Sequence, residues 1–313
     1  MNNTAWPSSL ESMEESEVDV DKLEFKKSVV VNATVENSQN ENDLITRYSS
    51  FMHLEVVSEL TTEAFLACLR RFLPERSKPA VIWSDNATNF KGARNILNAY
   101  NDICKSNPIQ GFSAEEGIQW KFIPPASPHF GGLWEANIKS VKRILLRVAK
   151  SAIMNFEELT TLVTQIEAVL NSRPLSPLFS DPSDLQPLTP GHFLTGSAML
   201  SFPEPHTASD SLSFHSTWEL LQRHQAKFWK RWHSEYLNQL QNRAKWSSSQ
   251  PNMQIGQLVL LKDSNSNLLH WPLGRIQQVH PGADDLVRVV EVKTSTGVLR
   301  RAINKIIPLP FKD

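Results

Sequence analysis

Apolar residues recur at three- and four-residue spacing in five stretches of the chain, and this spacing predicts amphipathic helices. The predicted helices cover residues 61–72, 86–101, 135–150, 156–172 and a stretch that begins near Trp218. Short runs rich in β-branched and aromatic residues alternate with the first of these helices and predict strands at 54–57, 81–83 and 118–122. This order predicts a right-handed crossover in a mixed α/β sheet, with strand 54–57 parallel to strand 81–83.

Two stretches without periodicity divide the chain. Residues from Met1 to about Lys22 are rich in Ser, Glu and Asp, with few large apolar side chains, which predicts a disordered segment. A long run rich in Pro and Ser, from Leu175 to Ser213, predicts a domain boundary. Beyond the helix that begins near Trp218, further strands are predicted at 257–261, 273–279, 286–292 and 298–302. Their regular spacing favours a small β-barrel.

The distribution of charge adds a second pattern. At 313 residues the chain is long enough for two domains, and its formal net charge of −1 indicates no particular partner. The balance hides a gradient, because the first fifty residues are acidic, whereas the helices beginning at Glu135 and near Trp218 are basic. We interpret the aromatic residues of the second basic helix as core or a dimer contact rather than as groups that stack on bases.

Cysteine content and hydropathy indicate the compartment. Cys68 and Cys104 are too few for a disulfide framework or a zinc site, and we interpret them as thiols of a reducing compartment. No apolar stretch approaches the length of a membrane span, and the N-terminus lacks a signal-peptide pattern. These features predict a soluble, intracellular protein without a membrane partner.

Two acidic residues stand at positions where a site is expected. Asp85 follows the strand 81–83 closely, and open α/β sheets place their sites at the carboxyl ends of strands. Glu135 lies in the first turn of its helix, after a loop with two glycines. Simpler interpretations stay open, because Asp85 suits an Asx turn and an acid in a first turn stabilises the helix dipole.

Basic side chains follow Glu135 along its helix, with no further acid. They are Lys139, Lys142, Arg143 and Arg147. Such cations pair with phosphates, and a carboxylate beside them suits a divalent metal held against a polyanion. We therefore interpret these four residues as DNA-binding, and the alternative is a solvated surface.

Several motifs resemble the integrases of BEL/Pao-type LTR retrotransposons. Ser84-Asp85-Asn86 and, fifty residues on, Pro128-His-Phe-Gly-Gly-Leu-Trp-Glu135 resemble the second and third acids of the Asp, Asp, Glu triad of retroviral-type integrases. The flanking segments that agree are Met52-His-Leu-Glu-Val-Val57, Thr62-Glu-Ala-Phe65, Leu170-Asn-Ser-Arg-Pro-Leu175 and Leu188-Thr-Pro-Gly-His-Phe-Leu194. The resemblance covers the chain from about Met52 to its C-terminus.

The resemblance implies a domain organisation and a site. The implied parts are a disordered or poorly ordered acidic segment at 1–51, an RNase H-like integrase core of class α/β at 52–200, a linker at 201–216, a basic aromatic helical segment at 217–250 and an SH3-like β-barrel at 251–313. The implied catalytic residues are Asp85 and Glu135, which would hold Mg²⁺ or Mn²⁺, and the implied partner is DNA.

One part of the family pattern is missing. The first Asp of the triad belongs on a strand about thirty residues before the segment that begins at Met52, and Asp19, Asp21 and Asp43 lack the expected context. We therefore expect the chain to be truncated on its N-terminal side, without the first core strands or a zinc-binding region. Because two carboxylates alone make a weak Mg²⁺ site, we also expect impaired catalysis.

Three functions stay open. The first is an enzyme, a polynucleotidyl transferase that joins retroelement DNA to a target in the nucleus. The second is a host-retained DNA- or chromatin-binding protein without catalysis. The third is a non-functional element remnant that folds poorly because its sheet lacks strands and leaves an open edge. Our main prediction is an integrase-derived, DNA-binding protein with impaired catalysis, and a homo-oligomer is a candidate assembly.

Overall fold

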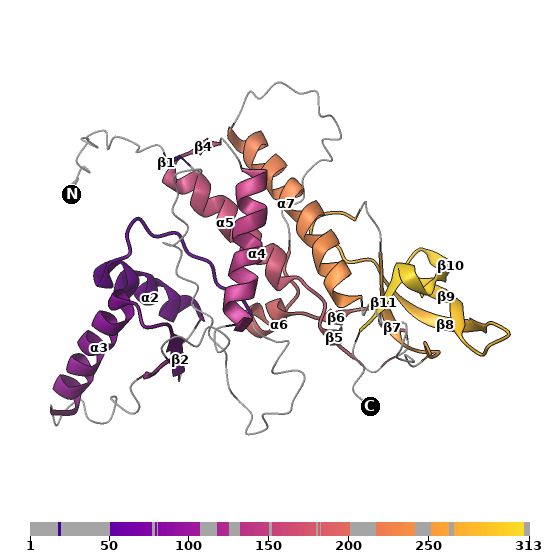
Figure 1. Cartoon of the computed structure of the whole chain (residues 1–313), viewed down its shortest axis with the longest axis horizontal. Helices are drawn as coiled ribbons and strands as arrows, with labels where there is room; N and C mark the ends of the chain where they lie inside the picture. Colours follow the sequence, from indigo (N-terminus) through magenta and orange to yellow (C-terminus); the bar gives the residue numbers. More distant parts are fainter. Residues whose placement is uncertain are drawn as a thin grey trace, which may run out of the picture.

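The computed structural model describes residues 18–19, 51–76, 79, 81–106, 118–124, 132–149, 152–179, 181, 183–200, 217–241, 252–262 and 266–309. For 18–19, 103–106, 132–137 and 217 it describes the backbone alone. The elements form three groups that follow each other along the chain and across the molecule (Figure 1). The class is mixed α/β, as predicted. Among the described residues, no helix is long and apolar enough to cross a membrane.

The first group packs two helices against a small parallel sheet. Its elements are α2 (Thr62–Arg76), β2 (Val81–Ser84), α3 (Thr88–Ser106) and β3 (Gln119–Phe122). The two strands pair in parallel, with Ile82 opposite Trp120, and both residues belong to the cluster that α2 and α3 cover. The structure confirms the helices predicted here, although α2 continues through Pro74 to Arg76, beyond the predicted end at residue 72.

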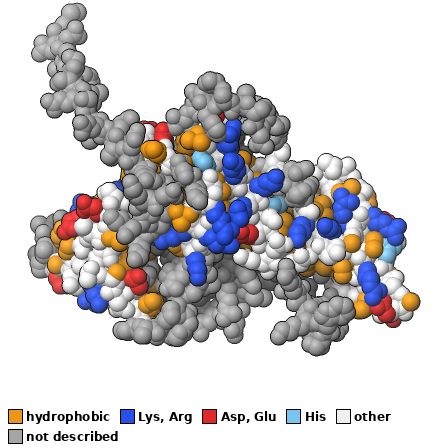
Figure 2. Space-filling view, turned by 45° about the horizontal axis from the view of Figure 1, so that its top comes forward, with side chains coloured by type: hydrophobic (Ala, Val, Ile, Leu, Met, Phe, Trp, Pro, Cys, Tyr) orange, Lys and Arg blue, Asp and Glu red, His pale blue; other side chains and the backbone are white. Residues whose placement is uncertain are grey.

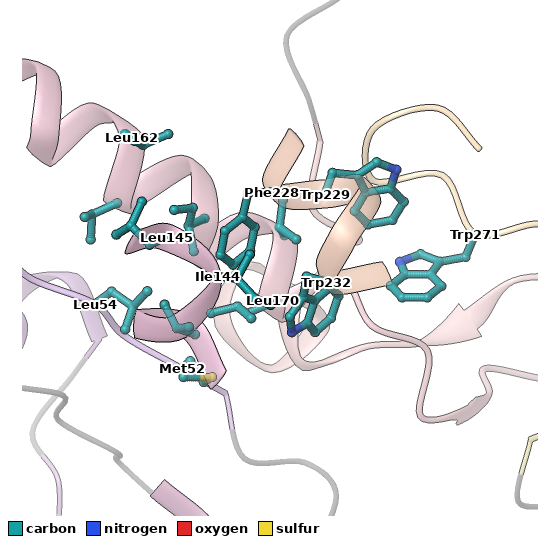
Figure 3. Packing of buried hydrophobic residues seen from close by; sticks show 14 of the residues in the cluster. Met52, Leu54, Ile144, Leu145, Leu162, Leu170, Phe228, Trp229, Trp232 and Trp271 are labelled. Atoms are coloured by element: carbon teal, nitrogen blue, oxygen red, sulfur yellow. The ribbon is translucent and has the colours of Figure 1, made fainter. Parts of the chain in front are cut away.

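The second group is helical. It contains α4 (Gly132–Val148), α5 (Phe156–Asn171), α6 (Pro190–Thr195) and α7 (Thr217–Leu240), with the short strands β4 (Ile153–Met154), β5 (Ser176–Pro177) and β6 (Pro187–Leu188) between them. Helix α7 packs against both α4 and α5, and the buried faces of all three share one hydrophobic cluster (Figure 3). Asn155 caps α5 by accepting a hydrogen bond from the backbone N–H of Glu158.

An extended segment, residues 51–57, joins these two groups, and here one prediction is wrong. The residues 54–57 were predicted to form a strand beside residues 81–83, but β2 pairs with β3 instead. The backbone of the segment is held by side chains of α5: Asn171 bonds both the N–H and the C=O of Met52, at 2.8 and 2.7 Å, and Glu167 accepts from the N–H of Leu54 at 2.8 Å.

The run of residues that suggested a strand is extended for a different reason, because the segment is buried on both sides. Phe51 and Val57 belong to the cluster of the first group, whereas Met52 and Leu54 belong to the cluster of α4, α5 and α7. Side chains of an extended chain point alternately to opposite faces. The segment therefore ties the two groups together, with a single β-bridge at Glu55 in place of the predicted strand.

The third group is a five-stranded antiparallel sheet. Its members are β7 (Leu258–Leu261), β8 (Leu273–Pro281), β9 (Val287–Thr294), β10 (Gly297–Ala302) and β11 (Ile306–Pro308), and a short 3-10 helix, η3 (Ile303–Lys305), precedes β11. The first four strands were predicted, and β11 was not. The order is β10-β9-β8-β7-β11, so β10 and β11 are the edges among the described residues, and closure into an SH3-like barrel stays a prediction.

The predicted domain limits also stay predictions, but two observations bear on them. Of the acidic segment 1–51, the structure describes Phe51 and the two-residue strand β1 (Val18–Asp19), which pairs with β4. The sheet and the helices share one core, because Leu258, Leu260 and Trp271 pack in the cluster of α4, α5 and α7.

Candidate nucleic-acid interface

Asp85 lies where the sequence analysis placed it, at the carboxyl end of the parallel strand pair. Its side chain is exposed, and its Oδ1 accepts a hydrogen bond from the backbone N–H of Ala87 at 2.9 Å. The neighbouring Asn86 donates from Nδ2 to the carbonyl of Ile123, at the end of β3, at 2.7 Å. Asp85 therefore forms an Asx turn, which is the simpler of the two interpretations given above.

The metal site is not assembled by the described side chains. Glu135 lies in the first turn of α4, but its side chain falls outside the described residues, so the predicted pairing of Asp85 with Glu135 stays a prediction. Within the described part of the chain, no group of three or more His, Cys, Asp or Glu residues could hold a metal ion. A two-metal site needs several carboxylates, so Asp85 alone does not form one.

The predicted DNA-binding cations lie along one side of α4. Lys139, Arg143 and Arg147 are exposed and spaced four residues apart, which keeps them on one helix face. Lys142 is half-buried, and burial lowers the pKa of its ammonium group. Three of the four residues are therefore open to solvent and to a polyanion.

Helix α7 adds cations to this face. Arg143 forms an ion pair with Glu235 of α7, and the other oxygen of Glu235 lies 3.8 Å from Nε of Arg231. Lys227, one turn before Arg231, is exposed as well. We call Lys139, Arg143, Arg147, Lys227 and Arg231 the α4–α7 basic face.

Basic side chains gather over the middle of the molecule in the space-filling view (Figure 2). Glu235 is the acid that the structure places within the α4–α7 basic face. The aromatic residues of α7 do not belong to it, because Phe228, Trp229 and Trp232 are buried in the core, as the sequence analysis interpreted them. The face can therefore attract phosphates but offers none of these rings to bases.

A buried charge network was missed by the sequence analysis. Glu167 is 6% exposed, and its carboxylate lies 3.2 Å from Nδ1 of His53 and 2.9 Å from Nη2 of Arg76. Glu55 lies 3.7 Å from Nε2 of His53 and pairs with Arg71. The available signal was the position of Glu167 beside Ile166 on the apolar side of α5, where a carboxylate needs a partner.

The network predicts a pH-dependent stability. Burial by itself lowers the pKa of His53, but the neighbouring carboxylates of Glu167 and Glu55 raise it to about 9, from an ordinary value of 6.5. The stabilisation is complete below pH 6.5 and is lost as the pH rises through 9, because the folded chain holds a proton that the unfolded chain releases. We expect the free energy of unfolding to fall by up to about 1.4 kcal/mol per pH unit in this window.

Urea titrations at a series of pH values measure this slope, and His53→Gln is the comparison. The difference between the two proteins should shrink as the pH rises from 6.5 to 9. Burial lowers the pKa of His224, so this residue changes stability below pH 6.5 and with the opposite sign. A difference that stays constant over the window would show that His53 is neutral in the folded protein.

A family model and several solved structures match this chain. A model of a family of unknown function, DUF5641, matches residues 216–309, which hold α7 and the five-stranded sheet. No curated protein matches. Among the solved structures that match is the cryo-EM structure of the simian T-cell lymphotropic virus intasome in complex with PP2A regulatory subunit B56 gamma. The identity is 10%, the match covers 85% of this chain and 70% of that chain, and the TM-score is 0.32, too low to support a conclusion about fold.

Proposed function

We propose that this chain is an integrase-derived protein of the BEL/Pao type that binds duplex DNA along the α4–α7 basic face. The observation that supports binding most directly is the packing of α4 against α7, which brings Arg143 and Arg231 to one acid, Glu235, on helices that also expose Lys139, Arg147 and Lys227. Cations in such an array release counterions from DNA when they pair with its phosphates. The motifs at Asp85 and Glu135 support the ancestry.

The proposal extends to fold and chemistry. An RNase H-like core accounts for the parallel strands followed by helices, and an SH3-like barrel accounts for the five-stranded sheet. We propose that the chain performs no strand transfer, because the sequence supplies two family-like carboxylates where the triad has three. The ancestral integrase would bind Mg²⁺, work in the nucleus and form a homo-oligomer. We propose these properties for the ancestor of this chain.

DNA titrations at 50 and 200 mM salt test the binding. The basic face carries a net charge of about +4 with Glu235 included, so the dissociation constant should rise roughly 10²-fold between the two salt concentrations. The affinity should be indifferent to DNA sequence, because phosphate contacts carry no sequence information. The variant with Lys139→Glu and Arg147→Glu should bind more weakly and lower the salt slope by about 2.

The matched control is the pair Arg70→Glu and Lys91→Glu. Both residues are exposed on the α2–α3 group, and the change in net charge is the same. The control should keep most of the affinity and nearly all of the salt slope. Equal losses in the two double variants would mean that net charge, and not the α4–α7 basic face, attracts DNA.

A further inference from the structure

Charge is divided unequally between the first fifty residues and the rest of the chain. Residues 1–50 contain ten acidic and four basic side chains, a net charge of −6. Residues 51–313 contain 23 acidic and 28 basic side chains, a net charge of +5. The near-neutral total thus arises from two parts that attract each other.

The structure anchors the acidic part beside α4. Strand β1 pairs with β4 in antiparallel register, with Val18 opposite Met154 and Asp19 opposite Ile153. A single turn, closed by a 3.0 Å hydrogen bond from the N–H of Ala152 to the carbonyl of Ala149, leads from the end of α4 to β4. Figure 1 shows this strand pair at the end of the helical group. The tether therefore starts near one end of the α4–α7 basic face.

The acids nearest the anchor are Glu11, Glu14, Glu15 and Glu17, which we call the acidic segment 11–17. Seven residues reach at most about 25 Å when extended. Nine helical residues separate Val148 from Lys139, and they rise about 14 Å. The acidic segment is therefore long enough to reach the cations at this end of α4, Arg147 and Arg143, while β1 stays paired with β4.

Open cations are available at this distance. Lys139 and Arg147 are exposed, and neither forms an ion pair with any residue in the described part of the chain. Tethering raises the local concentration of the segment, so several ion pairs that are individually weak can act together.

We propose that the acidic segment 11–17 binds the α4–α7 basic face of its own chain and competes there with the phosphates of DNA. The binding of the segment to the face is inferred from their opposite charges and from the pairing of β1 with β4. The competition with DNA rests on the proposed DNA binding. High salt, or a partner that takes the segment from the face, exposes the cations.

Two measurements on the full chain test this inference. In the first, Glu11, Glu14, Glu15 and Glu17 are changed to Gln, which leaves β1 intact, and binding to duplex DNA is titrated at 50 mM salt. Loss of the competitor should tighten binding about tenfold. The control neutralises four exposed acids of the α2–α3 group, Glu59, Glu63, Glu75 and Asp102, and should tighten binding far less.

The second measurement needs no DNA. A carbodiimide joins carboxylates to lysines in contact, and mass spectrometry should find the acidic segment linked to Lys139 or Lys227 at 50 mM salt but not at 500 mM. Absence of these links at low salt overturns the inference, as does DNA binding that the four Gln changes leave unaltered. If no variant binds DNA, the proposed function fails, and the cross-links alone decide whether the segment docks.

Discussion

Replacing Glu167 by alanine is expected to lower the free energy of unfolding by about 3–5 kcal/mol, because breaking a buried ion pair leaves uncompensated charge in the core. Arg76 would lose its carboxylate partner, His53 would keep only the more distant Glu55, and the N–H of Leu54 would lose its acceptor. Guanidinium denaturation followed by circular dichroism measures the change. A loss of this size is a large fraction of the stability of an ordinary domain.

Two further variants separate charge from shape. Glu167→Gln keeps an oxygen for the N–H of Leu54 but removes the charge, so it should fall between the wild type and Glu167→Ala. Glu157→Ala, at an exposed position in the first turn of the same helix, should cost at most about 1 kcal/mol. If Glu167→Ala costs no more than Glu157→Ala, the segment 51–57 is not held by the network.

The same network shows why one predicted strand was wrong. The β-branched residues at 54–57 correctly indicated an extended chain, but such a run does not reveal which groups satisfy the backbone. Here the partners are the side chains of Asn171 and Glu167, more than a hundred residues away. Only the packing of α5 against the segment could identify them.

Helices were predicted well because each carries an apolar stripe that its own sequence displays. Residues 156–172 were predicted and α5 spans Phe156–Asn171, with its stripe buried. The strand β11 was missed because its three residues are too few to show a period. It forms because Ile306 and Ile307 pair with β7 and enter the core.

The sequence predicted the part of the candidate interface that lies on α4, but not the part on α7. The sequence identified four cations along α4, of which Lys139, Arg143 and Arg147 are exposed on one face and Lys142 is half-buried. The cations that α7 adds were not predictable. Arg143 and Glu235 are 92 residues apart in the sequence, and their contact depends on how α4 and α7 pack. The same contact places an acid among the cations, which charge counting along one helix does not show.

Replacing Trp271 by alanine is expected to cost about 3–5 kcal/mol and to loosen the five-stranded sheet from α7. The indole is 6% exposed, and its Nε1 donates to Oγ of Ser172 at 3.1 Å. Its ring lies 5.1 Å from that of Trp229 and 5.6 Å from that of Tyr236, both in edge-on geometry. Removing it leaves a large cavity where the sheet, α5 and α7 meet.

Denaturation and limited proteolysis together measure this effect. Trp271→Ala should lower the guanidinium midpoint and speed cleavage within residues 252–309, since this region loses the indole that packs against the aromatic rings of α7. Trp271→Phe keeps a ring but not the bond to Ser172, so a smaller loss, about 1–2 kcal/mol, is expected. Trp218→Ala is the control, because this side chain is 49% exposed at the start of α7. If Trp271→Ala leaves the guanidinium midpoint unchanged, as Trp218→Ala should, then the sheet is stable without its contact with α7.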